Sequence, residues 1–311
     1  VVDGDAALTD ADTTTITYNT VASGLQYAGL RIKGDNAAVG DFVPGGTAVN
    51  VGFEPDVVFV WATRNTAAFS AANLTGLFLS FGFATAAGQR CIAMRSSDGA
   101  GTVGASSLYS QSYAAAAISG TGIDDGVSVT ITATGFSHTT TGTMTGKMAY
   151  MALKLPTGSA LGIVDLDTKT TTGTQSHSVS IEATAAVAMG TLANVTDSVE
   201  TTSDASTFAV GFWDGTTHRA VAITDDDGAT TTVSKSHASA ALLLVPSADG
   251  SDNISATVDS VTPSTFVLNY AGVDSTARKS SILLIKGVAT GLDDIDYLQP
   301  GIQTGTVPGM P

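Results

Sequence analysis

The segment LSFGFATAAGQRCIAMRSSDGAGT at residues 79–102 decides the fold, because it recurs as FAVGFWDGTTHRAVAITDDDGATT at residues 208–231. The two segments align without a gap at an offset of 129 residues. The identical positions are Gly82/Gly211, Phe83/Phe212, Arg90/Arg219, Ala93/Ala222, Asp98/Asp227, Gly99/Gly228, Ala100/Ala229 and Thr102/Thr231. A Phe, an Arg and an Asp-Gly pair in register are hard to obtain by chance, even in a chain rich in Ala, Gly and Thr. The match therefore indicates an internal duplication.

The flanking sequences extend the repeat in both directions. TAVNVGFEPDVVFV at 47–60 alternates like HSVSIEATAAVAMG at 177–190, which predicts that Val57 corresponds to Val187 at an offset of 130. KMAYMALK at 147–154 lies over KSSILLIK at 279–286 at an offset of 132. Loop insertions explain the small drift in offset, so each copy begins near residue 45 or 175 and ends near 154 or 286.

These boundaries divide the chain into four parts. Residues 1–40 are an N-terminal arm with one strand, 41–157 are the first copy, and 158–289 are the second copy. Residues 290–311 are rich in Pro and Gly and have no hydrophobic period, which predicts an extended C-terminal arm. Arms of this kind usually need a partner to become ordered.

The local sequence pattern favours β-structure almost throughout. Runs such as VSVTITATGF at 127–136 and FVLNYAGV at 266–273 alternate with period two and are rich in β-branched and aromatic residues. Segments 113–118 and 238–244 could form either a short helix or an apolar strand. We therefore expect an all-β fold of two tandem β-sandwich, jelly-roll-like domains with extended N- and C-terminal arms.

Composition limits the possible partners. The chain has 28 acidic and 13 basic residues and a net charge of −15, which repels phosphate backbones and anionic lipid surfaces. Its apolar runs are far shorter than the roughly 20 residues that span a bilayer. A single cysteine, Cys91, allows no disulfide within the chain and is expected to be a small buried apolar residue. We expect neither a nucleic acid nor a membrane as partner.

An acidic run is the one candidate for metal binding. Asp225 and Asp227 belong to a run of three aspartates before Gly228, and hard cations favour several oxygen ligands on a short turn. The first copy has Ser96 in place of Asp225, however, so the copies share only the Asp-Gly that a tight hairpin turn requires. Asp225 and Asp227 are therefore weak metal candidates, and we expect no cofactor.

The repeated arginine and aspartate predict a structural contact. Arg90 precedes Asp98 by eight residues, and Arg219 precedes Asp227 by the same spacing. Such spacing suits two strands of a hairpin, so the expected role in each copy is a cross-strand ion pair or an arginine that covers apolar surface, in preference to ligand binding.

No motif in the sequence indicates catalysis. There is no G-x-S-x-G nucleophile elbow, the four histidines have no zinc-type spacing, and the chain contains three glutamates in all. We therefore expect a protein that is not an enzyme.

Two stretches of the first copy carry a family resemblance. GGTAVNVGFEPDVVFVWAT at 45–63 and FGFATAAGQRCIAMRSSDGAGT at 81–102 resemble a pattern of predicted structural proteins of tailed phages and related environmental viruses. The resemblance covers 45–154 well and 175–286 in outline, since the second copy has Glu182 to Ala185 in place of the Gly-Phe-x-Pro element.

The resemblance implies a non-enzymatic virion protein on the particle exterior. The first expectation is a capsid-surface decoration or vertex (turret) protein, which would contact other copies of itself, with a trimer favoured, and other virion proteins. A tail tube, collar or fibre subunit is the alternative. A carbohydrate-binding adhesin that recognises a host-surface glycan is the second alternative.

Overall fold

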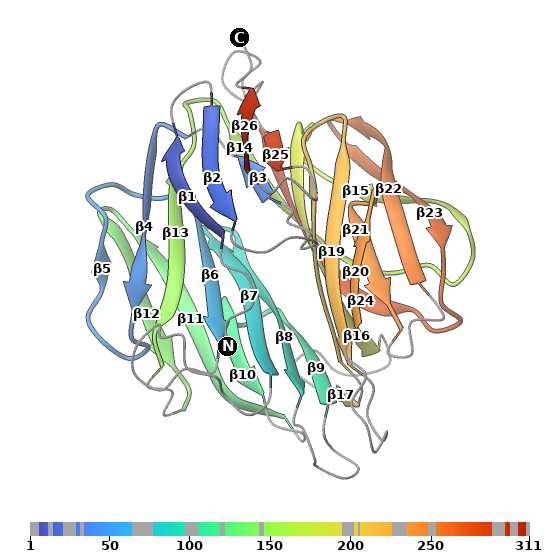
Figure 1. Cartoon of the computed structure of the whole chain (residues 1–311), viewed down its shortest axis with the longest axis horizontal. Coiled ribbons are helices and arrows are strands. Elements are labelled where there is room, and N and C mark those ends of the chain that lie inside the picture. The colour runs from blue at the N-terminus through green and yellow to red at the C-terminus, as the bar shows by residue number, and fades with distance from the viewer. Residues whose placement is uncertain are drawn as a thin grey trace.

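The computed structural model describes the backbone of residues 6–11, 15–20, 29–31, 34–63, 77–96, 105–118, 122–142, 146–194, 202–204, 206–225, 235–247, 253–287, 296–298 and 304–308. The described chain is all-β and forms two tandem sandwiches with the same strand order (Figure 1). No helix in these ranges is long and apolar enough to cross a membrane.

The first repeat packs a large sheet against a small one. Its large sheet has the order β17-β9-β8-β7-β6-β13-β4, in which β17 (Thr202–Asp204) comes from the second repeat, and its small sheet has the order β10-β11-β12-β5. The strands of this repeat are β4 (Asn36–Phe42), β5 (Val49–Asn50), β6 (Val57–Thr63), β7 (Leu77–Thr85), β8 (Gly88–Ser96), β9 (Ala105–Ser110), β10 (Ala115–Ile118), β11 (Ile123–Thr132), β12 (Gly135–Thr140) and β13 (Met148–Lys154). Strand β4 pairs with β13 along its whole length, so this repeat begins before the boundary predicted at residue 41.

The second repeat has the same arrangement. Its large sheet has the order β14-β24-β16-β18-β19-β20, and its small sheet has the order β15-β23-β22-β21. Its strands are β14 (Ala160–Asp167), β15 (Gly173–Ser178), β16 (Ala185–Asn194), β18 (Ser206–Trp213), β19 (His218–Asp225), β20 (Lys235–Ser239), β21 (Leu243–Pro246), β22 (Asn253–Thr262), β23 (Thr265–Gly272) and β24 (Arg278–Lys286). Each strand except β17 therefore has one counterpart in the other repeat.

The ladders confirm one part of the sequence alignment and correct another. Phe83 opposes Arg90 as Phe212 opposes Arg219, in agreement with the offset of 129. In contrast, Phe59 opposes Phe83 whereas Val187 opposes Phe212, so Phe59 corresponds to Val187. The predicted match of Val57 with Val187 was therefore wrong by two residues. A shift of two leaves the alternation of faces unchanged, so the pattern alone could not reveal it.

A glycine in each repeat explains why part of the sequence was retained. A Cβ atom added to Gly82 would lie 2.3 Å from the carbonyl oxygen of Ala114, just before β10. A Cβ atom added to Gly211 would lie 1.7 Å from the carbonyl oxygen of Leu242, just before β21. The large and small sheets thus approach each other at backbone distance at this point, which only glycine permits.

The two repeats pack through the outer faces of their large sheets, meaning the faces turned away from their own small sheets. Strands β8 and β9 of the first repeat contact β16 and β18 of the second. A continuous apolar core fills this inter-repeat interface. Its buried members are Val57, Phe59, Phe81, Phe83, Ile92, Tyr109, Leu153, Leu155, Ala185, Val187, Met189, Ala193, Leu283 and Ile285. The layers therefore follow the order small, large, large, small sheet, with three cores between them.

Backbone pairing also joins the repeats. Strand β17 (Thr202–Asp204) lies between β16 and β18 in the chain, yet it pairs with β9 of the first repeat. The terminal segments pair with each other as well. Strand β2 (Thr15–Thr20) lies between β1 (Ala6–Ala11) and β26 (Thr304–Pro308), and β3 (Gly29–Arg31) pairs with β25 (Asp296–Leu298). The C-terminal segment predicted as an extended arm thus supplies strands whose partners lie at the N-terminus.

Candidate functional site

A polar cluster at the inter-repeat interface centres on Asp165. Arg90 from β8 donates two hydrogen bonds to this carboxylate from β14, with distances of 2.6 Å from Nε to Oδ1 and 2.5 Å from Nη2 to Oδ2. Tyr109 from β9 donates a third hydrogen bond from Oη to Oδ1 at 2.5 Å. Gln111 donates from Nε2 to Oη of Tyr109 at 3.3 Å. Each donor belongs to the first repeat, and the carboxylate belongs to the second.

Partial burial and opposite charge strengthen the contact between Arg90 and Asp165. The side chain of Arg90 is 16% exposed and that of Asp165 is 31% exposed, so water screens the pair only in part. Burial raises the pKa of Asp165, but the hydrogen bonds from Arg90 and Tyr109 outweigh it and hold the pKa below its usual value. Burial likewise raises the pKa of the Tyr109 hydroxyl, which remains a donor. The carboxylate therefore stays ionised and occupied by its two partners.

The structure shows a partner of Arg90 other than the one expected from the sequence. Strand β8 runs from Gly88 to Ser96 without a turn, and Asp98 lies beyond it, outside the described residues. The six residue steps from Arg90 to Ser96 alone cover about 20 Å of extended strand. Strand β19 likewise runs from His218 to Asp225, and Asp227 lies outside the described residues, so the expected Arg219–Asp227 pair stays a prediction. The real partner of Arg90 is 75 residues away in the chain.

The recurrent hairpin lies earlier than the Asp-Gly pairs. Strands β7 and β8 are joined by a tight turn after Thr85, and β18 and β19 by a turn that contains Gly215 at φ 98°. Asp98 and Asp227, with their glycines, fall at 97–104 and 226–234, which lie outside the described residues. Their prediction as turn residues therefore remains a prediction.

Asp225, a weak metal candidate, lies at a second polar contact between the repeats. It is 1% exposed and accepts a hydrogen bond from Ser96 Oγ of the first repeat. The other candidate, Asp227, lies outside the described residues. In the ranges that the structure describes, no group of three or more His, Cys, Asp or Glu side chains could hold a metal ion. The observed partner of Asp225 is thus a serine hydroxyl.

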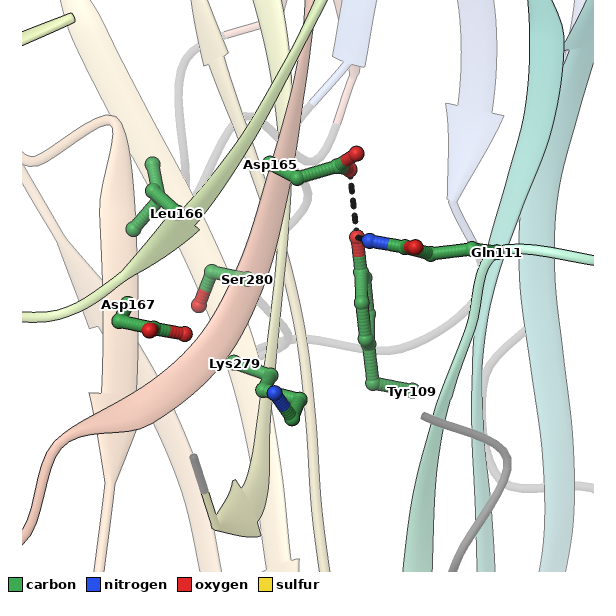
Figure 2. A pocket seen from close by; sticks show the side chains of 7 residues that line it. All are labelled: Tyr109, Gln111, Asp165, Leu166, Asp167, Lys279 and Ser280. Carbon is green, nitrogen blue, oxygen red and sulfur yellow. Dashed lines mark hydrogen bonds between the residues drawn. The ribbon is translucent and has the colours of Figure 1, made fainter. Parts of the chain in front are cut away.

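A polar pocket opens beside the Asp165 cluster. Its cavity volume is about 230 Å³, and it is lined by Tyr109, Gln111, Asp165, Leu166, Asp167, Lys279 and Ser280 (Figure 2). Figure 2 shows β9 contributing Tyr109, with Gln111 just after it, on one side, and β14 and β24 contributing the rest on the other. Asp167 and Lys279 are register partners across β14 and β24. The pocket can offer a carboxylate, an ammonium and an amide to a hydrophilic ligand.

The arrangement gives little support to acid–base catalysis. A general acid at neutral pH needs a carboxyl group whose pKa is raised, whereas the pKa of Asp165 is lowered. Its two oxygens also accept hydrogen bonds from Arg90 and Tyr109. Asp165 itself was not singled out by the sequence, because nothing local distinguishes it from the other aspartates. The one feature of the sequence that could have pointed to Asp165 is Asp41, which occupies the corresponding position on β4: Asp41 opposes Ala149 as Asp165 opposes Ser281.

Comparison with known proteins gives no relative: no family model matches the chain, and no curated protein or solved structure matches it significantly.

Proposed function

We propose that this chain is a non-enzymatic structural protein on the exterior of a virus particle, most specifically a decoration or vertex protein of a tailed virus capsid. One observation carries the proposal. The described residues that the duplication retained are used for packing sheets or repeats together. Gly82 and Gly211 allow the sheets of each sandwich to touch, Phe83 lies in the inter-repeat core, and Arg90 binds the other repeat.

The physical properties of the chain support an outer structural layer. Two sandwiches fused through an apolar core form a stiff body, because sheet-on-sheet packing leaves little room for relative motion. A net charge of −15 disfavours contact with packaged DNA and suits an outward position. The resemblance of residues 45–63 and 81–102 to structural proteins of tailed phages points in the same direction.

Particle labelling tests this proposal directly. An antibody raised against the purified chain is applied to intact particles of the virus that encodes it, and gold labels are located by electron microscopy. Labels on the capsid surface support decoration. Labels along the tail support the alternative of a tail tube, collar or fibre subunit. Absence of the chain from purified particles, checked by mass spectrometry of its peptides, overturns both virion roles.

A carbohydrate-binding role is the second candidate, and the polar pocket favours it. Asp167, Lys279 and Gln111 could hydrogen-bond sugar hydroxyls in a cavity of about 230 Å³. Glycan-array binding by the wild-type chain that is lost in Asp167→Asn would support an adhesin. No binding by either protein would exclude this candidate.

A further inference from the structure

In each repeat, a side chain on the large sheet accepts a hydrogen bond from the backbone of the small sheet. In the first repeat, Oε1 of Gln89 on β8 accepts from the Val129 N–H on β11 at 2.9 Å. In the second repeat, Nε2 of His218 on β19 accepts from the Val258 N–H on β22 at 3.0 Å. The two acceptors are 129 residues apart, and so are the two donors, which is the offset of the duplicated hairpin. These two inter-sheet hydrogen bonds are therefore equivalent, although the residue that accepts differs.

Both donors lie where the pairing of a small-sheet strand ends. Val129 and Val258 are two residues beyond the last pair that β11 forms with β10 and that β22 forms with β21. The carbonyls of Val127 and Ala256, two residues earlier, still accept backbone hydrogen bonds on that side. Because backbone groups two residues apart on a strand point the same way, the next N–H has no strand partner there. A partly buried N–H of this kind needs another acceptor, and the two side chains supply it.

The two acceptors respond differently to acid. The amide of Gln89 does not titrate, so its Oε1 accepts a hydrogen bond at any pH at which the chain is folded. The imidazole of His218 accepts at Nε2 only while it is neutral, because both ring nitrogens of the protonated form are donors. A protonated His218 therefore presents an N–H to the N–H of Val258 and can no longer bind it.

The surroundings of His218 favour its neutral form. Burial lowers the pKa of His218; Asp214 in the turn after β18 raises it, and Arg219 lowers it further. On β22, the charged residue nearest in sequence to the donor is Asp259, which is exposed to water. The imidazole also stacks on Trp213 with ring centroids 6.4 Å apart, beyond the roughly 6 Å within which an aromatic ring attracts a cation. The folded repeat thus holds the imidazole in the form that accepts.

We propose that His218 is an acid-sensitive switch in the second repeat: a proton bound at Nε2 releases the Val258 N–H and loosens the contact between β19 and β22, whereas Gln89 keeps the first repeat closed. Histidine in an unfolded chain has a pKa of about 6.5. Since the folded pKa is lower, the stabilisation is complete above that value and is lost as the pH falls from it through the folded pKa. The switch belongs to the chain itself and does not depend on a place in a virus particle.

Amide hydrogen exchange of the wild-type chain tests the switch within one molecule. The protection factors of the Val258 and Val129 amides, which correct for the intrinsic pH dependence of exchange, are measured by NMR at about pH 7.5 and about pH 5. We expect the protection of Val258 to fall by about tenfold relative to that of Val129, since one pKa unit corresponds to a tenfold change. An equal fall at both amides, or no fall at Val258, would overturn the inference.

Exchanging the two acceptors tests the role of the imidazole. His218→Gln gives the second repeat the acceptor of the first, so the protection of Val258 should no longer depend on pH. Gln89→His should make the Val129 amide sensitive to acid.

A second histidine provides the matched control. The pKa of His177 is also lowered by burial, but its Nε2 has no hydrogen-bond partner among the described residues. His177→Gln should therefore leave the fall at Val258 unchanged. If the fall at Val258 persists in His218→Gln, or disappears in His177→Gln, the switch is not His218. The wild-type comparison of the two amides remains decisive if a variant does not fold.

Discussion

Ser96 and Asp225 occupy the same position in the two repeats and hydrogen-bond to each other across the inter-repeat interface. Both are buried, with exposed fractions of 6% and 1%. At the other end of β8, Arg90 binds Asp165 on β14. Since β14 and β19 are separated by three strands in their sheet, β8 crosses the strands of the second repeat instead of running along them.

Removing the Ser96 hydroxyl should destabilise the chain. Ser96→Ala leaves the buried Asp225 carboxylate without this donor, and an unsatisfied buried acceptor costs about 1–3 kcal/mol. Chemical denaturation followed by tryptophan fluorescence measures the change in the free energy of unfolding. Ser178→Ala, at an exposed position, is the control with no expected change. Equal stability of Ser96→Ala and wild type would show that this hydrogen bond contributes nothing.

The repeated glycines should not tolerate a side chain. Gly82→Ala and Gly211→Ala each place a Cβ atom within 2.3 Å of a carbonyl oxygen, so the sheets must separate. We expect each to lower the free energy of unfolding by about 3 kcal/mol. Gly122→Ala is the matched control, because an added Cβ there has no atom within 4 Å. A mild effect at Gly82 or Gly211 would contradict the close approach of the sheets.

The Arg90–Asp165 pair should contribute more than its counterpart on the open face. Arg90→Ala removes a two-point contact to a partly buried carboxylate, and we expect a loss of about 2 kcal/mol. Lys147→Ala is the matched control, because Lys147 pairs with Asp41, the counterpart of Asp165, at 2.8 Å. That pair is 34% and 40% exposed, so its loss should change stability by less than about 0.5 kcal/mol. Thermal unfolding of both variants tests the ranking, and equal losses would refute it.

Acid should weaken the inter-repeat interface through Asp165. The pKa of Asp165 is lower in the folded chain than in the unfolded one, so its stabilisation is present above the unfolded value. An aspartate in the unfolded chain has a pKa of about 4. The stabilisation is lost as the pH falls from that value through the lower pKa of the folded chain. The stability difference between wild type and Asp165→Asn should therefore be largest near neutral pH and shrink on acidification. Denaturation curves from pH 7 downwards measure it.

A control separates this effect from general acid sensitivity. The pKa of Asp274 is also lowered: burial raises it, but a backbone hydrogen bond from Thr276 and contacts with Arg278 outweigh that effect. Asp274→Asn should therefore show the same pH trend, but Asp274 lies within the second repeat, away from the polar contacts between the repeats. A disulfide across the inter-repeat interface should restore the stability of the wild type at low pH only if Asp165 acts at that interface. A stability difference for Asp165→Asn that stays constant with pH would contradict the assigned ionisation.

The local sequence predicted much of the fold because strands and turns depend on neighbouring residues. Period-two alternation predicted the β-structure, and the match of Gly82, Phe83 and Arg90 with Gly211, Phe212 and Arg219 predicted the duplication. The strand register was harder to predict from the sequence, because Ala185 and Val187 point to the same face and either could align with Val57. Most of the first strand, β4, fell within residues 1–40, which were assigned to the N-terminal arm, and only its pairing with β13 places it in the sandwich.

The sequence by itself determined that the chain is an all-β tandem repeat, because hydrophobic alternation and the repeated hairpin are local properties. Only the tertiary structure decided that the large sheets face each other, that Arg90 binds Asp165, and that Val39 is left open while Ile163 is covered. Val39 and Ile163 are equivalent in sequence pattern and strand register. They differ only in what packs on them, which depends on how two whole sheets are oriented and not on any neighbouring residue.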